Sequence, residues 1–556
     1  MLFSPGLVTF LVLLASASAS RVPPPQAAVY LGYASYQGVV DSAANVTNFL
    51  GVRYAAAPVG PLRFSSPRAP PTVPGLTPAN TQPSRCFQAG SGQSKLINPL
   101  RELQETGRVR PSASSTGGSA IVAEDSEDCL FLNVHVPGDF YKTQSLPVVV
   151  WFHGGGYVSG SASADNGADL VKVSKHGVVV VSIQHRLGVF GFLAGKEVKT
   201  GGSLNAGLLD QEFALEWVQT HIAKFGGDPK RVTLWGQSAG AGGVLQQVIS
   251  RNGQTNPPLF RGAIASSTFL PSQYRFDEKI PQGLYNTVVA RLNCTTAPST
   301  LTCLRSAPAA SLQATNVAMN TAAFFGTFTF MPVIDGEFVV RRVSESLRVG
   351  KVNGKALLAV TNTNEGLRFV DANSTASVSP SDYAHLLFPK FDRALAERAG
   401  ALYGGRPATG AESGVVRLQG EANFICPSHY FAEAFKSRTS FVGEYAVPLA
   451  AHGDDMAYYF ISRPTRAFNH PSFLTSFPES YLSFVISQDP NVKLSQGDIK
   501  PPWSKFGYGG GERLAGREMM FNRTEAGELD ITEVATDGGL AERCRFWESV
   551  SAFTGQ

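Results

Sequence analysis

Gly236-Gln237-Ser238-Ala239-Gly240 follows the apolar run Val232-Thr233-Leu234-Trp235 and opens a segment of small residues that can continue as a helix. A serine between two glycines at a strand-to-helix junction is typical of a nucleophile elbow. Such a serine sits on a tight, strained turn, and Gly236 and Gly240 remove the side chains that would collide there. Five residues of this composition also arise by chance, so the elbow needs partners elsewhere in the chain.

A second glycine-rich segment lies upstream, after another expected strand. The run Leu146-Pro147-Val148-Val149-Val150-Trp151-Phe152 is almost continuously apolar, as in a strand buried on both faces, and ends at His153-Gly154-Gly155-Gly156. Consecutive glycines let backbone N–H groups point into a site, and such a loop accompanies the elbow in α/β-hydrolases. A plain glycine-rich turn is the alternative for this segment alone. Together with the elbow it favours a hydrolase.

Between residues 127 and 244 the chain carries a series of short motifs. They are EDCLFLNV (127–134), HGGGY (153–157), RLGVFGFL (186–193), NAGLLDQ (205–211) and FGGDP (225–229). In this order and spacing they resemble the type-B carboxylesterase/lipase family, which includes cholinesterases and fungal secreted lipases. The similarity continues more thinly from LGVRY (50–54) to CRFW (544–547). It implies an α/β-hydrolase fold, in which a large, mostly parallel sheet carries helices on both faces and insertions surround an active-site gorge.

The chain order of this fold places an acid and then a histidine after the serine. Leu357-Leu358-Ala359-Val360-Thr361 has the composition of a strand and is followed closely by Glu365-Gly366. From the residues alone, a solvated loop carboxylate is the favoured interpretation of Glu365. The resemblance reverses this preference, because Glu365-Gly366 looks like the family's acid motif and His452-Gly453 stands where the family has its base. It therefore implies a catalytic triad of Ser238, Glu365 and His452.

The remaining site residues are also implied by the resemblance. Ser266 and Asp455 are expected near the triad, with Asp455 in place of the glutamate of cholinesterases. His429 lies three residues after Cys426 in a helical pattern and is expected to be structural.

The implied chemistry is ester hydrolysis through an acyl-enzyme, by a carboxylic ester hydrolase. The N–H groups of Gly155, Gly156 and Ala239 are expected to bind the oxyanion. No metal or organic cofactor is required.

The sequence narrows the substrate mainly by what it lacks. Cholinesterases hold a quaternary ammonium with a tryptophan in the first cysteine loop and carry a glutamate before the serine. Here the loop from residue 87 to 128 contains no tryptophan, and Gln237 precedes Ser238.

In the same loop, residues 96–103 form one short amphipathic patch and residues 112–119 are polar, so a soluble-ester carboxylesterase is favoured over a lipase with an apolar lid. A lipase or sterol esterase, and a silent binding or adhesion protein, are the alternatives.

Composition indicates one large α/β-hydrolase domain over residues 21–556. The 556 residues contain no glycine/serine linker, charge run or internal repeat. The 47 basic and 43 acidic residues leave a net charge of +4, too weak and dispersed to indicate a nucleic-acid partner. We expect an ester as the binding partner, and the sequence leaves the oligomeric state open.

Residues 1–20 are expected to be a signal peptide and the protein to be secreted. Residues 7–14 form an apolar core too short to span a bilayer, and the small residues 15–20 follow it, although a basic n-region is missing. No membrane anchor is expected.

Six cysteines suit an oxidising compartment and allow fifteen pairings. The resemblance selects Cys86 with Cys129, Cys294 with Cys303, and Cys426 with Cys544. The candidate glycosylation sites are Asn45, Asn293, Asn373 and Asn522.

Overall fold

A computed structural model of the chain describes residues 1, 27–107, 124–138, 140–141, 145–407, 409–507 and 512–556. Residues 2–20 of the expected signal peptide and the polar segment 112–119 lie outside this part, so both stay predictions. No helix among the described residues has the length and hydropathy to span a membrane.

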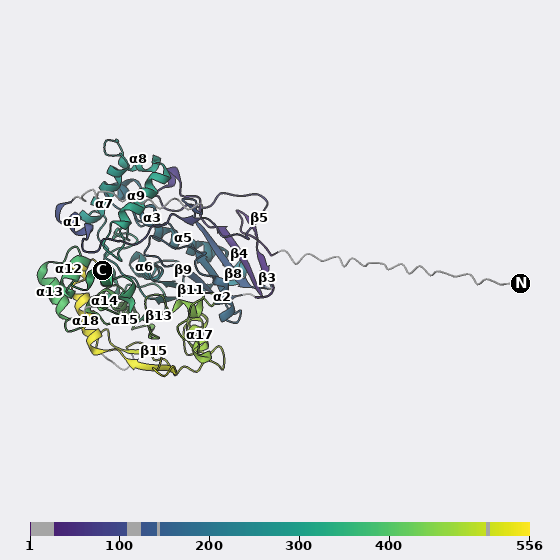
Figure 1. The fold of residues 1–556 in the computed structure, drawn as a ribbon. Helices are drawn as coiled ribbons and strands as arrows, with labels where there is room; N and C mark the ends of the chain where they lie inside the picture. Colours follow the sequence, from purple (N-terminus) through teal and green to yellow (C-terminus); the bar gives the residue numbers. More distant parts are fainter. Residues whose placement is uncertain (2–26, 108–123, 139, 142–144, 408, 508–511) are drawn as a thin grey trace.

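One sheet of eleven strands organises the described chain (Figure 1). Pairings within the central run from β10 to β15 are parallel, and the outer pairings are antiparallel. In spatial order the strands are β16 (Leu529–Ala535), β15 (Arg517–Arg523), β14 (Thr439–Tyr445), β13 (Ala356–Asn362), β12 (Gly262–Ser266), β11 (Gly227–Gln237), β9 (Leu146–Phe152), β10 (Val179–Ile183), β8 (Phe131–Pro137), β4 (Val46–Arg53) and β3 (Val39–Asp41). The expected large, mostly parallel sheet is confirmed.

The apolar runs of the central strands are explained by burial on both faces. In β9, Val148, Val150 and Phe152 join the apolar cluster packed under α5 (Ala206–His221), α6 (Ala239–Gly253) and α15 (Cys426–Ala434). Val149 and Trp151 point the other way, into the cluster under α2 (Gly167–Val173) and α17 (Pro471–Ser487). Because both faces exclude water, every position of the strand gains from being apolar.

The other elements surround this core. Figure 1 shows α7, α8 and α9 gathered at one end of the molecule, and α12, α13 and α18 at another. The remaining helices are α1 (Pro99–Thr106), α3 (Gly188–Phe192), α4 (Lys196–Gly201), α7 (Lys279–Arg291), α8 (Thr300–Ser306), α9 (Ala309–Thr321), α10 (Val343–Arg348), α11 (Ala372–Thr375), α12 (Pro380–Leu387), α13 (Arg393–Ala401), α14 (Gly414–Gly420), α16 (Met456–Tyr459), α18 (Gly538–Ser549) and α19 (Ser551–Thr554), with short helices η1 (Gly60–Leu62), η2 (Ile222–Phe225), η3 (Glu365–Arg368) and η4 (Glu421–Ile425). Two small sheets contain β1 (Ala28–Tyr30), β2 (Ser35–Gln37) and β5 (Leu76–Pro78), and β6 (Arg85–Cys86) with β7 (Asp125–Ser126).

The register of the parallel strands brings the expected site segments to one edge of the sheet. Gly236 on β11 pairs with Phe152 at the end of β9, and Gln237 pairs with Ser266 at the end of β12. Ser266 in turn pairs with Val360 near the end of β13. In open α/β sheets ligands bind beyond the carboxyl ends of the strands, and the chain continues there into the expected elbow, glycine loop and acid.

Candidate active site

Ser238 occupies the turn between β11 and α6 with φ 58° and ψ −126°, a strained backbone for a residue with a side chain. A Cβ on Gly236 would lie 2.3 Å from the carbonyl carbon of Gly240, and one on Gly240 would lie 2.0 Å from the carbonyl oxygen of Phe152. Larger residues at either position would therefore open the turn. The predicted strand–turn–helix is present, with the serine at its apex.

Ser266 fastens this turn to the neighbouring strand. Its carbonyl oxygen accepts a 2.9 Å hydrogen bond from the N–H of Ser238. Its hydroxyl oxygen accepts from Trp235 Nε1 at 3.2 Å, beneath the elbow. The backbone of Ser266 therefore holds the serine turn in place, while its side chain contacts the core.

Glu365 and His452 meet although they lie on separate loops. Glu365 is fully buried, and its Oε1 accepts a 2.7 Å hydrogen bond from the N–H of Asn362. Its Oε2 accepts a hydrogen bond from Nδ1 of His452. A carboxylate only accepts, so Nδ1 carries the proton and Nε2 presents a lone pair.

The lone pair of His452 Nε2 faces Gln237. The side-chain Nε2 of Gln237 lies 3.2 Å from it. Among the described residues no hydrogen bond joins the Ser238 hydroxyl to His452. Hydrogen bonds of catalytic groups are often long before substrate binds.

Aromatic rings enclose the imidazole of His452. The ring centroid of Phe424 lies 4.6 Å away and that of Phe369 lies 5.0 Å away, edge on. Phe424 also stacks on Phe269 at 5.2 Å. These rings shield the Glu365–His452 pair from water, which strengthens its electrostatic interaction. No pattern in the sequence singled them out, because they come from separate loops and short helices.

The glycine loop after β9 lies against the elbow. Gly155 and Gly156 have φ values of 112° and 63°, which favour glycine. A Cβ on Gly154 would lie 3.2 Å from Cβ of Ser238. Within the described chain, the N–H groups of Gly155, Gly156 and Ala239 have no protein acceptor. These three donors, in the loop and the turn that pack together, thus remain available to a ligand.

His153, at the start of this loop, is held by a partner that the sequence did not reveal. Its ring stacks on His185 with centroids 4.8 Å apart and an interplanar angle of 2°. Burial lowers the pKa of both rings, that of His185 to about 3 with a further contribution from His153. Two neutral imidazoles can stack in this way without charge repulsion, which fixes the loop.

Asp455 is buried beside the acid. Its Oδ1 accepts from Asn362 Nδ2 at 3.2 Å and its Oδ2 accepts from the Tyr459 hydroxyl at 2.9 Å. Burial raises its pKa to about 6; the charge of Glu365 adds to the rise, while the two hydrogen bonds and His452 oppose it. Asn362 therefore bridges two carboxyl groups, a role that its position in the sequence did not suggest.

A sequence profile described as the carboxylesterase family matches residues 32–515. The chain belongs to the carboxylesterase family. Carboxylesterase patB of Penicillium expansum is 30% identical over 508 residues, covering 84% of this chain and 88% of that protein. Secreted triacylglycerol lipase LIP1 of Gibberella zeae is 28% identical over 510 residues, covering 84% and 83%. The crystal structure of Aspergillus niger EstA matches with a TM-score of 0.78 at 26% identity, covering 96% of this chain and 99% of that one. The protein is thus a carboxylic ester hydrolase with the α/β-hydrolase fold, as the resemblance implied.

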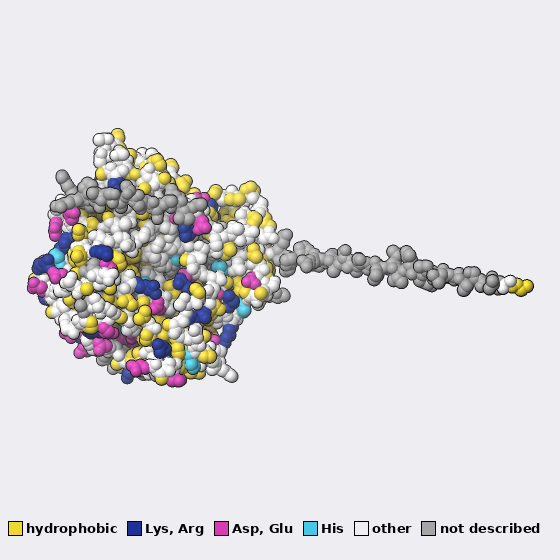
Figure 2. Space-filling view, in the orientation of Figure 1, with side chains coloured by type: hydrophobic (Ala, Val, Ile, Leu, Met, Phe, Trp, Pro, Cys, Tyr) yellow, Lys and Arg dark blue, Asp and Glu magenta, His cyan; other side chains and the backbone are white. Residues whose placement is uncertain are grey.

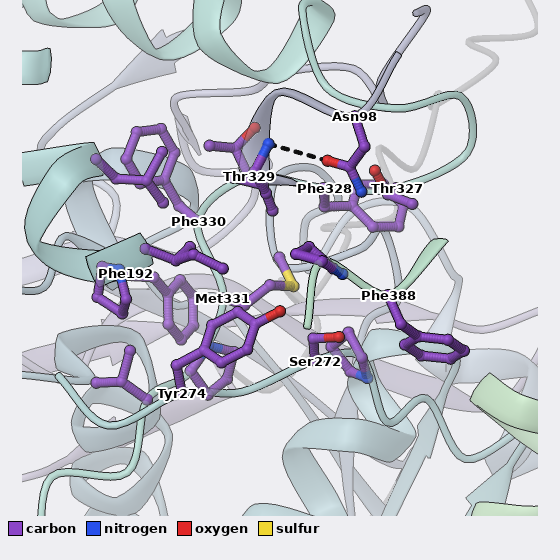
Figure 3. A pocket seen from close by; sticks show the side chains of 18 of the residues that line it. Asn98, Phe192, Ser272, Tyr274, Thr327, Phe328, Thr329, Phe330, Met331 and Phe388 are labelled. Carbon is purple, nitrogen blue, oxygen red and sulfur yellow. Dashed lines mark hydrogen bonds between the residues drawn. The ribbon is translucent and has the colours of Figure 1, made fainter. Parts of the chain in front are cut away.

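A cavity of this carboxylesterase has Phe328 in its wall (Figure 3), the residue that packs against Gly156 of the glycine loop. Its unfilled space is about 820 Å³, part of it open to solvent. The walls come from the segment 326–333, from Tyr274 and from residues 387–389, and no described lining side chain is charged. From the sequence we expect insertions at residues 274–328 and 369–392 to shape the acyl and alcohol pockets, but a linear sequence does not identify their inward-facing residues.

All six cysteines are paired in the structure. The disulfides are Cys86–Cys129, Cys294–Cys303 and Cys426–Cys544, the three pairs implied by the family resemblance. Within the described residues, no group of three or more His, Cys, Asp or Glu side chains is arranged to hold a metal ion.

The four sequon asparagines lie in different surroundings. Asn45, Asn293 and Asn373 are exposed, whereas Asn522 on β15 is half-buried. Exposure makes the first three accessible to a glycosyltransferase, and glycosylation of any of them stays a prediction.

His429, the expected structural histidine, is buried in α15, with Nδ1 3.3 Å from the carbonyl oxygen of Leu514.

Proposed function

We propose that this carboxylesterase hydrolyses esters through an acyl-enzyme on Ser238, with His452 as general base and Glu365 as its orienting acid. The observation that carries the proposal is the hydrogen bond from His452 Nδ1 to the buried Glu365 carboxylate, next to the strained Ser238 turn. A buried acceptor at Nδ1 leaves Nε2 as the only basic atom of the ring.

The steps follow from these positions. Ser238 Oγ attacks the ester carbonyl carbon while His452 Nε2 takes the hydroxyl proton, and Glu365 stabilises the imidazolium. The N–H groups of Gly155, Gly156 and Ala239 receive the charge on the carbonyl oxygen. The tetrahedral intermediate then expels the alcohol, which takes the proton from His452. Water repeats the cycle on the acyl-enzyme, releasing the acid and restoring Ser238.

The substrate class and location belong to the same proposal. We infer a protein secreted after removal of residues 1–20, with residues 21–556 forming one domain; three disulfides and the secreted relative support this. A soluble-ester carboxylesterase is favoured by the polar composition of residues 112–119. The similarity to a secreted triacylglycerol lipase supports a lipase as the second candidate.

The test is hydrolysis of p-nitrophenyl esters from acetyl to palmitoyl by the secreted protein, with Ser238→Ala as the inactive control. We expect fast turnover of the short chains and loss of about a thousandfold or more in kcat in the variant. A preference for long chains with activation at an oil interface would replace carboxylesterase by lipase. Full activity of Ser238→Ala would contradict the assignment of Ser238, and no turnover of any ester in this series would leave a narrow-specificity enzyme or a binding protein.

A further inference from the structure

The uncharged cavity shares a wall with the proposed oxyanion-binding loop. A Cβ on Gly156 would lie 2.2 Å from Cε1 of Phe328, and Phe328 also lines the cavity. Phe269, a second wall residue, packs edge-on against Phe328 at 5.8 Å and stacks on Phe424, which contacts His452. An ester carbonyl carries two groups, the acyl chain and the alcohol part, which are called its arms below. If the carbonyl is held at Gly156, one of these arms would lie beside Phe328, at the start of this cavity.

The cavity is suited to a neutral, bulky and mainly apolar arm. Its lining contains aromatic, aliphatic and proline side chains but, among the described residues, no Asp, Glu, Lys, Arg or His. A charged group would lose its hydration there without gaining a counter-charge. Apolar surface of the substrate gains from leaving water in proportion to its area.

Two neighbouring hydroxyls of this lining, those of Ser272 and Tyr274, are the polar side-chain groups that have no hydrogen bond of good geometry to a described residue. The side chains of Asn98, Thr327, Thr329, Gln419 and Asn423 all take part in hydrogen bonds with protein groups. The Tyr274 hydroxyl is buried and makes no hydrogen bond of acceptable geometry to any described residue. Figure 3 shows it directed toward Met331 in the middle of the cavity, whereas Asn98 lies at the edge with its amide engaged.

The Tyr274 phenol is a hydrogen-bond donor over the whole working range of pH. Burial raises its pKa above the ordinary value for tyrosine, and the neighbouring Ser272 only partly offsets this. Buried hydroxyls nearly always have a partner in folded proteins, and one left without a partner is unfavourable. A ligand oxygen at this point would supply the missing acceptor.

We propose that this cavity binds one arm of the ester substrate and that Tyr274 selects arms carrying a neutral oxygen acceptor, such as an ether, hydroxyl or ketone, beyond an apolar stem. The inference rests on the proposed function, because it takes Gly156 as part of the oxyanion site. The arm comes from either the acid or the alcohol of the ester, and the two sources call for separate substrate series.

The test compares esters that differ only by oxygen against methylene. For the acid arm, the pair is p-nitrophenyl (p-methoxyphenyl)butanoate and its p-ethylphenyl counterpart; for the alcohol arm, acetates of the matching arylpropanols are followed by acid release. In one of the two series we expect the wild type to prefer the methoxy ester about three- to tenfold in kcat/KM, the range of one hydrogen bond. Tyr274→Phe should bring this ratio to about one. The matched control is Tyr285→Phe, which removes a buried-ring hydroxyl that instead contacts Thr300 at 2.7 Å outside the cavity.

A second variant tests the cavity itself. Ala194→Phe adds a ring to the wall and should lower kcat/KM for both arylalkyl esters at least tenfold more than for p-nitrophenyl acetate. Two results would overturn the role of Tyr274. One is a wild-type ratio of kcat/KM for the methoxy over the ethyl ester of one in both series, and the other is the same ratio in Tyr274→Phe as in the wild type. Hydrolysis of p-nitrophenyl acetate that depends on Ser238 would leave the proposed function standing in that case, whereas its absence would refute the proposed function itself.

Discussion

The side-chain amide of Gln237 lies 3.2 Å from Nε2 of His452, the ring nitrogen that Glu365 does not bind. An amide at this place is neutral and adds no charge that would hold a proton on the imidazole, but its N–H must release Nε2 before the ring takes the proton of Ser238. A carboxylate in the same position would instead favour the imidazolium. For Gln237→Glu we therefore expect the acidic limb of the kcat/KM profile to move to higher pH by about one unit or more. The measurement is p-nitrophenyl acetate hydrolysis from pH 5 to 9.

An exposed glutamine provides the control for net charge. Gln254 lies on the surface after α6, so Gln254→Glu adds the same charge away from the ring. Its pH profile should follow that of the wild type, because exposed charges are screened by salt. An unchanged profile in Gln237→Glu would mean that this amide does not face the catalytic nitrogen in solution.

Gly156→Ala should abolish most of the activity with little loss of folded protein. The methyl group would lie 2.2 Å from Phe328, at a backbone φ of 63° that disfavours any side chain. The loop must therefore shift, which moves the expected oxyanion donors. Losing one such donor typically costs roughly a hundred- to a thousandfold in kcat. Purified variant and wild type would be compared by kcat and by circular dichroism.

Gly60→Ala is the matched control for backbone strain. Gly60 has a φ of 53° but nothing within 4 Å of its added Cβ. It should cost about 1 kcal/mol of stability and leave kcat unchanged. If Gly60→Ala lowered kcat as much as Gly156→Ala, general destabilisation would explain the effect and the contact with Phe328 would not.

The disulfides and the Glu365–His452 pair were predicted only through the family resemblance, whereas the parts that the residues predict by themselves depend on local chain geometry. Ser238 and the loop at Gly155 are short, glycine-dependent turns after buried strands, so their composition reveals them. Asn362 and His185 act across the fold, through a 3.2 Å hydrogen bond to Asp455 and a ring stack on His153. Neither contact leaves a spacing in the sequence, because the partners meet only when β-strand ends come together.

The lining of the cavity was beyond prediction for a related reason. Tyr274 and Phe388 are 114 positions apart in a chain with 16 tyrosines and 36 phenylalanines, and nothing local distinguishes a residue that faces a cavity from one in the core. The insertions could be located, but which side chains turn inward is decided by their packing against α7 and the 326–333 segment.

Asp455→Asn should remove a pH-dependent loss of stability. With a pKa of about 6 when folded, Asp455 keeps its proton to higher pH than in the unfolded chain, where it ionises near pH 4. The wild type therefore loses stability as pH rises from about 4 to 6, and the loss is complete above that window. Two pKa units correspond to roughly 3 kcal/mol in the free energy of unfolding. The Asp455→Asn protein keeps this stability as pH rises, because its amide does not ionise.

Thermal unfolding of both proteins from pH 4 to 8 measures this effect. The Tm of Asp455→Asn relative to wild type should rise across the window and then level off. Tyr459→Phe removes a hydrogen bond that lowers the pKa of Asp455 in the folded protein, so it should move the upper end of the window to higher pH. Parallel Tm curves for wild type and Asp455→Asn would show that Asp455 is already ionised at pH 4.

The disulfides should differ in how much they stabilise the fold. Cys426 and Cys544 close a loop with a sequence separation of 118, whereas Cys294 and Cys303 are separated by 9. In the chain-entropy account, loop closure then contributes about 4.9 and about 2.6 kcal/mol, because a longer loop removes more freedom from the unfolded chain. Replacing Cys426 and Cys544 by alanine should therefore lower Tm further than replacing Cys294 and Cys303. Each double variant avoids a free thiol, and urea unfolding of the pair gives the difference in free energy. If the two double variants lost equal stability, or if the order were reversed, the Cys294–Cys303 disulfide would stabilise the protein through native packing around the short loop rather than by restricting the unfolded chain.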